Sequence, residues 1–311
     1  MSSCIFRDGI ILAACAEERF SRIKRDPSFP HRAIEFCLNE SGIKFSQLNS
    51  ISVGWNPAFY MEKKNNVVLK ALKDKGMIIY HVLNELGSAE YTDSLSHIDQ
   101  NLFFKDGSII PIEFTDHHLA HASYAFHNSG YESALTVVLD GFGEIHTGGI
   151  FKMSNQESKI IANSKFPHSI GLFYSAITQY LGFRPNSDEW KIMALASMGN
   201  SENYKDDFSK MIKVGKDSFN GFLELDLNYF DFYNFFTTGY TSDKFHLKYG
   251  DPRKSNEPLE QKHKDIAKAL QEVVEEKVIK LLSNLNLQFP LEKNLCLSGG
   301  FFMNSALNGK I

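Results

Sequence analysis

A buried strand that runs into a glycine turn decides the fold: residues 134–144 read ALTVVLDGFGE. The apolar run from Ala134 to Leu139 is typical of a buried strand. It ends in Asp140-Gly141-Phe142-Gly143-Glu144, where the glycines allow backbone N–H groups to approach phosphate oxygens. An ordinary hairpin turn explains the same residues equally well. Both interpretations stay open on this motif alone.

Regular elements are predicted on both sides of this strand. Antiparallel strands are expected at 148–152 and 158–163, after a strand at 109–114. The other expected elements are, in chain order, strands at 4–6 and 10–16 around Asp8-Gly9, a helix at 30–41, a strand at 51–53, helices at 168–181, 189–198 and 258–285, and a strand at 294–298. Residues 57–108 are interpreted as an insertion or cap, and residues 200–255 as aromatic and irregular. This order predicts a mixed α/β fold with antiparallel hairpins at the sheet edge, flanked by helices.

Composition excludes several classes of protein. The chain has 311 residues, enough for one large domain or two lobes, and a net charge of −4, so no global basic field favours nucleic acid. We find neither an apolar run long enough to span a membrane nor a signal peptide, and we expect a cytoplasmic protein. The 4 cysteines lack C-x-x-C spacing and have apolar neighbours, so we expect buried thiols rather than a structural zinc site.

The strongest chemical motif is Asp116-His117-His118-Leu119-Ala120-His121. We expect Asp116 to cap a helix on which His117 and His121, four positions apart, share one face. Asp140, at the end of the buried strand, is a natural third ligand, and His127 follows nearby. A polar helix end with solvated histidines is the alternative. His118 stands where the zinc protease motif needs a glutamate, so that general base is absent.

Two weaker motifs remain. The paired glycines of Leu297-Ser298-Gly299-Gly300 follow a strand and permit close packing against a base or ribose, although a strand-to-helix turn explains them too. The basic loop from Arg19 to Asp26, with Ser187–Lys191 as its expected counterpart, offers groups for an anion. A solvated charged loop is the alternative interpretation.

These segments together resemble the ATP-dependent O-carbamoyltransferases of the nodulation and cephem-antibiotic type. The resemblance runs nearly end to end and is weak only at about 57–108 and 200–255. It is carried by ordered blocks at 16–24 with 27–30, 116–122, 138–144, 168–174 with 180–183, 191–196, and 297–300 with Asn304. Several blocks in one order are far more specific than any single motif.

The resemblance implies a single N-terminal carbamoyltransferase domain over residues 1–311. Its fold is similar to that of the actin, sugar-kinase and chaperone ATPase superfamily, with a first lobe at about 1–165 and an incomplete second lobe at about 166–311. His117, His121 and Asp140 match the family's metal ligands, and we favour iron over zinc or manganese. The expected nucleotide contacts are two phosphate loops containing Ser2, Ser3, Gly141 and Gly143, and an adenosine site containing Gly299, Gly300 and Asn304.

The resemblance also implies chemistry. Carbamoyl phosphate and ATP would form a carbamoyl-adenylate on a C-terminal domain similar to the YrdC family. The N-terminal domain would then pass the carbamoyl group to a hydroxyl of a sugar or other small molecule. A divalent metal would stabilise the developing charge, Lys24 would add to this effect, and a histidine, which we assign to His118, would accept the hydroxyl proton.

The sequence departs from the family pattern at both ends. Met1 falls where the family has an aspartate, and the family's last metal ligand, a later aspartate, has no counterpart before Ile311. We therefore expect a fragment without the YrdC-like domain. A separate chain that carries this domain is an expected partner, and a homodimer is another.

Three functional hypotheses stay open. The first is an O-carbamoyltransferase domain, active with a partner chain or left over from an active ancestor. The second is a non-catalytic nucleotide- or metal-binding remnant of such an enzyme. The third, a metal-dependent hydrolase, is disfavoured because no glutamate follows His117.

Overall fold

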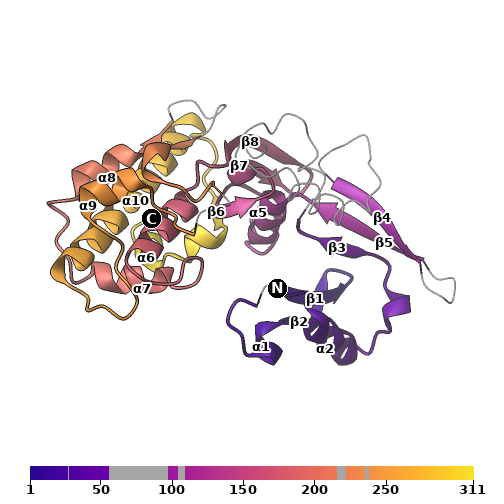
Figure 1. Cartoon of the computed structure of the whole chain (residues 1–311). Helices are drawn as coiled ribbons and strands as arrows, with labels where there is room; N and C mark the ends of the chain where they lie inside the picture. Colours follow the sequence, from indigo (N-terminus) through magenta and orange to yellow (C-terminus); the bar gives the residue numbers. More distant parts are fainter. Residues whose placement is uncertain (27, 56–96, 104–108, 216–221, 235–237) are drawn as a thin grey trace. The chain divides into compact units, whose positions relative to one another are not determined.

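The computed structural model describes residues 1–26, 28–55, 97–103, 109–215, 222–234 and 238–311. The chain divides into two compact units (Figure 1). Unit 1 comprises Met1–Val53 with Asp99–Phe114, and unit 2 comprises Gly54–Ile98 with Thr115–Ile311.

The described residues of unit 1 form two small sheets. Strands β1 (Ser2–Arg7) and β2 (Ile10–Ala16) form the predicted hairpin, and its turn residues Asp8 and Gly9 have φ of 53° and 79°. Helix α2 (His31–Ser41) packs on the hairpin through Cys37, which joins Ile5 and Ala13 in a small core. The second sheet has the order β3-β5-β4 and consists of β3 (Ile51–Val53), β5 (Ile109–Thr115) and β4 (His97–Phe103). Two short helical elements lie in the same unit, α1 (Glu18–Ser21) and η1 (Phe45–Gln47).

Unit 2 is built on a four-stranded mixed sheet of order β11-β6-β7-β8. Strand β6 (Ser133–Gly143) contains the motif that decides the fold, and it pairs antiparallel with β7 (His146–Ser154), which pairs antiparallel with β8 (Ser158–Lys165). Strand β11 (Leu295–Ser298) joins the other edge of β6 in parallel. The central strand β6 thus lies between neighbours of both directions, as a mixed sheet requires.

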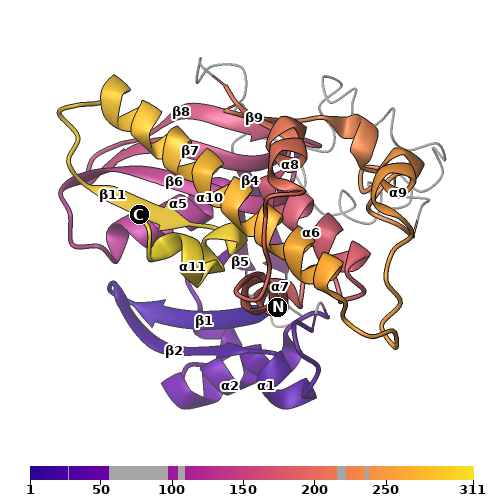
Figure 2. The same ribbon diagram turned by 90° about the vertical axis from the view of Figure 1, so that its left-hand side faces the viewer.

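Alternation along β6 directs side chains to two different cores. Val137 and Leu139 face a large core beneath the helices α6 (Ile170–Tyr180) and α10 (Gln261–Gln288), whereas Val138 faces a smaller core beneath α5 (His117–His127). Successive strand residues point to opposite faces, so a strand with apolar residues throughout becomes covered on both. Figure 2 shows α10 crossing the sheet.

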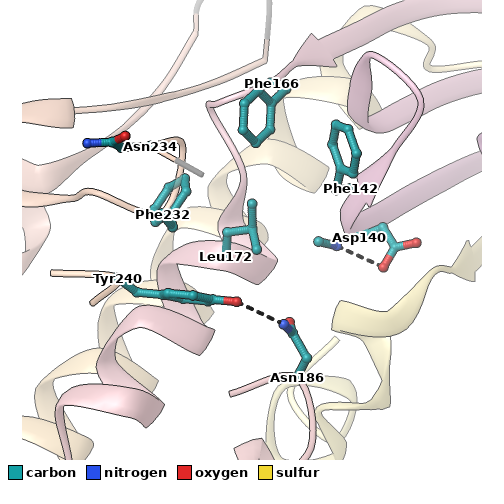
Figure 3. A pocket seen from close by; sticks show the side chains of 9 residues that line it. Asp140, Phe142, Phe166, Leu172, Asn186, Phe232, Asn234 and Tyr240 are labelled. Atoms are coloured by element: carbon teal, nitrogen blue, oxygen red, sulfur yellow. Dashed lines mark hydrogen bonds between the residues drawn. The ribbon is translucent and has the colours of Figure 1, made fainter. Parts of the chain in front are cut away.

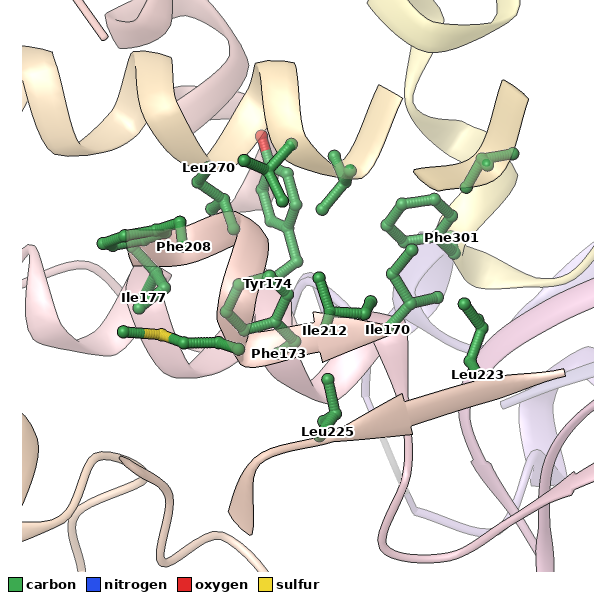
Figure 4. Packing of buried hydrophobic residues seen from close by; sticks show 14 of the residues in the cluster. Ile170, Phe173, Tyr174, Ile177, Phe208, Ile212, Leu223, Leu225, Leu270 and Phe301 are labelled. Atoms are coloured by element: carbon green, nitrogen blue, oxygen red, sulfur yellow. The ribbon is translucent and has the colours of Figure 1, made fainter. Parts of the chain in front are cut away.

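The large core is mostly helical (Figure 4). Phe173, Phe208 and Leu270 are fully buried in it, from three different helices. The elements that enclose it are α6 (Ile170–Tyr180), α7 (Glu189–Ala196), α8 (Lys205–Met211), β9 (Ile212–Val214), β10 (Leu223–Leu225), η3 (Leu227–Tyr229), α9 (Asp243–Tyr249), α10 (Gln261–Gln288), η4 (Gly300–Met303) and α11 (Ser305–Asn308).

Most predicted elements are confirmed, and the mixed α/β class with them. The likeness to the actin-type fold, the boundary between lobes near 165 and the single-domain assignment stay predictions. Much of the expected insertion at 57–108 lies outside the described residues, although a strand, β4, occupies His97–Phe103. No helix in the described ranges is long and apolar enough to cross a membrane.

Two expectations were wrong. Residues 200–255 were expected to be irregular, yet they hold two seven-residue helices, α8 and α9, and the β9–β10 hairpin. Helices this short span only two turns and leave little periodicity to detect. Not all thiols are buried either: Cys4 is exposed and Cys15 is half-buried.

Helix α10 provides a matched test of the core. Leu270 is 0% exposed and Leu287 is 79% exposed on the same helix. Leu270→Ala should lower the free energy of unfolding by about 3–5 kcal/mol, because it removes buried apolar atoms and leaves a cavity. Leu287→Ala should change it by less than about 0.5 kcal/mol. Equal effects of the two variants in denaturant titrations would show that this face of α10 is not the core face.

Candidate metal centre

The histidines of the candidate site are positioned by the start of α5. The Asp116 carboxylate accepts a hydrogen bond of 2.6 Å from the Leu119 N–H and so caps the helix, as the sequence predicts. His117 and His121 lie one turn apart, with ring centroids separated by 4.6 Å. Both imidazoles therefore point to the same region beside the sheet.

Asp140 is oriented by backbone groups from two strand ends. Its Oδ1 accepts hydrogen bonds from the N–H of Gly141 at 2.8 Å and of Gly300 at 3.3 Å. Its Oδ2 lies 3.0 Å from Nε2 of His117 and 3.3 Å from Nε2 of His121. One carboxylate oxygen is thus held by the backbone, and the other is presented to the two rings.

A further contact sets the direction of the His117 ring. Its Nδ1 lies 3.0 Å from the carbonyl oxygen of Gly54, to which an Nδ1–H can donate. Without a metal, an Nε2–H can donate to Oδ2 of Asp140 at 3.0 Å; with a metal bound, the Nδ1 contact would leave Nε2 free to act as the ligand atom. Histidines that bind metals characteristically donate their second ring N–H to a carbonyl or carboxylate in this way. The Trp55 ring packs against the His117 ring with centroids 5.3 Å apart.

The geometry fits one ion. The three ligand atoms lie within 4.8 Å of one another. Donors bonded to one ion at about 2.0–2.2 Å lie roughly 3.0–3.5 Å apart, close to the observed 3.0 Å and 3.3 Å contacts with Oδ2. The side chains of His117, His121 and Asp140 are 23%, 33% and 17% exposed, so a further ligand or a substrate can reach the ion. Two imidazoles and a carboxylate suit iron, zinc or manganese.

Electrostatics favour the charged carboxylate. Burial alone would raise the pKa of Asp140, but hydrogen bonds from His117, His121 and the Gly141 N–H hold it well below its usual value. Burial would lower the pKa of His117, but the Asp140 carboxylate, the Gly54 carbonyl and the charge of Glu144 raise it instead. The Asp140 carboxylate is therefore charged at neutral pH.

Close approach explains two of the glycines. A Cβ on Gly143 would lie 2.5 Å from Cδ2 of His117, so this part of the hairpin has room for the ring only without a side chain. Gly299 has φ of +92°, and a Cβ there would meet the Leu139 carbonyl oxygen at 2.3 Å. The register of β6 and β7 also shifts between Leu139 and Gly143, where Asp140 lies. Such irregularities commonly redirect a side chain near a site.

The D-G-F-G segment belongs to strand β6 of the β6–β7 hairpin, an arrangement that is compatible with both of its interpretations. Strand β6 continues through it, and Gly143 pairs with His146. Phosphate binding by Gly141 and Gly143 stays a prediction. The Gly141 N–H already donates to Asp140, so a phosphate would have to use other groups of the hairpin.

His118, the predicted proton acceptor, is 1% exposed and is not one of the three residues of the cluster. Neither ring nitrogen has a hydrogen-bond partner among the described residues, and burial lowers the pKa of the imidazole to about 3. The ring is neutral at physiological pH and has no exposed surface for a substrate in this conformation. Its catalytic role stays a prediction.

The other predicted residues lie outside the cluster. Ser2, Ser3 and Lys24 belong to unit 1, whereas the cluster belongs to unit 2. Asn304 is buried; it caps α11 and exchanges hydrogen bonds of 3.0 Å with Gln271. The nucleotide contacts predicted for Ser2, Ser3, Gly299, Gly300 and Asn304, and the role of Lys24, stay predictions.

Three further residues show which parts of the site could be predicted from the sequence. His127 is exposed at the far end of α5 and does not support the metal interpretation. Glu144 is fully buried, and its carboxylate oxygens lie 3.2 Å and 3.3 Å from the backbone nitrogen of His117. Its position directly after Gly143 could have predicted that it lies beside the site. The Gly54 contact left no signal, because it uses a backbone carbonyl.

The fold and the site define a mixed α/β protein with a candidate two-histidine, one-carboxylate metal centre. Residues 2–311 match the family described as carbamoyltransferase N-terminus, and the chain belongs to this family. All of the chain aligns with an uncharacterized protein of Synechocystis sp. at 32% identity and with the nodulation protein NolNO of Sinorhizobium fredii at 29%. It also aligns throughout with an uncharacterized protein of Methanocaldococcus jannaschii, at 30% identity. These alignments cover 50%, 42% and 50% of the three relatives, so the chain spans about half their length.

The hairpin glycines provide a matched test of the metal centre. Gly143→Ala should displace the His117 ring, because the added Cβ would lie 2.5 Å from Cδ2. We expect metal affinity to fall by at least about tenfold, as when a group that orients a ligand is lost. Gly141→Ala is the control, because its Cβ would meet nothing closer than 4.0 Å. Equal zinc affinities of the two variants in competition titrations would contradict the proposed packing.

Proposed function

We propose that this chain takes part in ATP-dependent transfer of a carbamoyl group to a hydroxyl of a sugar or other small molecule. The observation that carries the proposal is the cluster of His117, His121 and Asp140 in a member of the carbamoyltransferase N-terminus family. The proposed donor is a carbamoyl-adenylate made from carbamoyl phosphate and ATP. Since the chain spans about half the length of its relatives, the activity of the whole protein is part of the proposal.

The residues of the cluster are proposed to hold a divalent metal, with iron favoured over zinc or manganese. A bound metal would supply Lewis-acid stabilisation of charge on the carbonyl or phosphate oxygens of the donor. With a metal bound, the Gly54 carbonyl would keep the proton of His117 on Nδ1 and leave Nε2 as the ligand atom. The N–H groups of Gly141 and Gly300 fix the Asp140 carboxylate without competing for Oδ2.

Other roles are proposed from the family resemblance. Ser2 and Ser3 would bind phosphates, Gly299 and Gly300 would lie against the adenosine, and Lys24 would stabilise negative charge in the transition state. A carbamoyl-adenylate-forming domain on the same or a separate chain is the proposed partner. A homodimer and a cytoplasmic location stay predictions from the sequence.

The test uses the 311-residue chain and a non-hydrolysable carbamoyl-adenylate analogue in calorimetric titrations. The combined substitution His117→Ala and His121→Ala should remove bound iron or zinc. It should also weaken binding of the analogue by at least about tenfold, because a metal contact contributes several kcal/mol to charge stabilisation.

His127→Ala is the matched control, since this exposed histidine of the same helix lies outside the cluster. It should leave both metal content and affinity unchanged. Unchanged metal content in the double variant, measured by elemental analysis, would contradict the metal centre. If AMP and the analogue bound with equal affinity, and neither affinity depended on the metal, the result would favour a non-catalytic nucleotide-binding remnant.

A further inference from the structure

One of the ordered blocks in the sequence, residues 168–174, has no role in the proposed function. It reads HSIGLFY and contains the start of helix α6, for which Ser169 is the N-cap residue. The Ser169 Oγ accepts a hydrogen bond of 3.0 Å from the Leu172 N–H, as an N-cap serine characteristically does. The side chain is fully buried, and its hydroxyl hydrogen is left to donate to another group.

The hydroxyl of Ser169 donates to the backbone carbonyl of Asp140, with 3.0 Å between the two oxygens. The helix also packs directly on the same peptide group. A Cβ on Gly171 would lie 2.6 Å from the Asp140 carbonyl oxygen and 2.8 Å from the Gly141 nitrogen. Figure 3 shows Asp140 and Leu172, from the first turn of α6, on the wall of one cavity. The first turn of α6 therefore contacts the peptide group between Asp140 and Gly141.

Asp140 lies where the sheet ladders are interrupted. The register of β6 with β7 breaks between Leu139 and Gly143, and the pairing of β6 with β11 ends at Val138. Asp140 is thus paired in register with neither neighbouring strand. Backbone polar groups that leave a ladder need other hydrogen-bond partners. The hydroxyl of Ser169 is such a partner for the Asp140 carbonyl.

Planarity of the peptide group connects this carbonyl to the carboxylate of Asp140. The C=O and N–H of one trans peptide group share a plane and point in opposite directions. The N–H of this group belongs to Gly141 and donates to Oδ1 of Asp140 at 2.8 Å, the bond drawn as a dashed line at Asp140 in Figure 3. A hydroxyl that holds the carbonyl therefore also directs the N–H. That N–H holds Oδ1 and leaves Oδ2 for the two histidines.

We infer that Ser169 is a positioning residue for Asp140: through the Asp140–Gly141 peptide group it fixes the direction of the carboxylate. The consequence for metal binding rests on the proposed function, in which Asp140 is a ligand. Ser169 is not one of the three cluster residues, so it acts on the metal only through Asp140. Without the hydroxyl, the carbonyl loses its donor and the peptide group is freer to rotate, so Oδ2 is presented to the histidines less precisely.

The experiment compares the 311-residue chain with three single variants. Ser169→Ala removes the hydroxyl. Ser169→Gly removes it as well but destabilises the start of the helix less, because glycine is a better N-cap residue than alanine. Ser242→Ala is the matched control, since Ser242 is the N-cap of α9 in the same unit. Its hydroxyl likewise accepts from a backbone N–H, of Phe245, and donates to a backbone carbonyl, of Asn228.

Two measurements are made on each chain. In competition titrations, the Kd for zinc should rise by at least about tenfold in both Ser169 variants, as when a group that orients a metal ligand is lost. It should be unchanged in Ser242→Ala. In NMR spectra of the metal-free chain with isotope-labelled glycine, the amide signal of Gly141 should move in both Ser169 variants and stay in place in the control. Gly141→Ala lacks this signal and so assigns it.

Zinc affinity equal to that of the unsubstituted chain in both Ser169 variants would overturn the inference. An unmoved Gly141 signal in these variants, or an equal loss of affinity in Ser242→Ala, would overturn it as well. If the unsubstituted chain bound no zinc, the metal centre of the proposed function would be contradicted. A Gly141 signal that moved only in the Ser169 variants would then still support the positioning of Asp140, so the two failures can be told apart.

Discussion

The carboxylate of Asp140 is the group on which the arrangement of unit 2 depends. One oxygen accepts hydrogen bonds from Gly141 and Gly300, and the other lies within 3.3 Å of both histidines. A half-buried carboxylate without partners would be costly, so these contacts both stabilise the charge and fix its direction. They also join three parts of the chain that are remote in sequence: the start of α5, the end of β6 and the turn after β11.

The sheet brings these parts together. Parallel pairing of β11 with β6 places the turn at Gly300 beside Asp140, although the two are 160 residues apart. Packing of α5 against the small core through Ala122 and Phe126 holds the helix that carries the histidines. The absence of a side chain at Gly143 then lets the hairpin approach His117. The metal centre is thus a consequence of strand order and of packing on one face of the sheet.

The sequence predicted the features that depend on local periodicity. His117 and His121 share a helix face, and Asp140 ends an apolar strand, so their meeting followed from spacing and strand position. The burial of His118 did not follow, because it depends on how α5 is rotated against the sheet. The contact between His117 and the Gly54 carbonyl could not be predicted either, because every residue has a backbone carbonyl. Phe232 and Tyr240, which line a cavity beside Asp140, lie outside the helices and strands, and only tertiary packing brings them near Asp140.

The central claim is that His117, His121 and Asp140 hold one ion together. X-ray absorption spectroscopy of the chain loaded with one equivalent of zinc tests it most directly. We predict multiple scattering from two imidazole rings, with nitrogen ligands at about 2.0–2.1 Å, and reduction to one ring in His121→Ala. A spectrum with no imidazole scattering, or one that His121→Ala leaves unchanged, would contradict the claim.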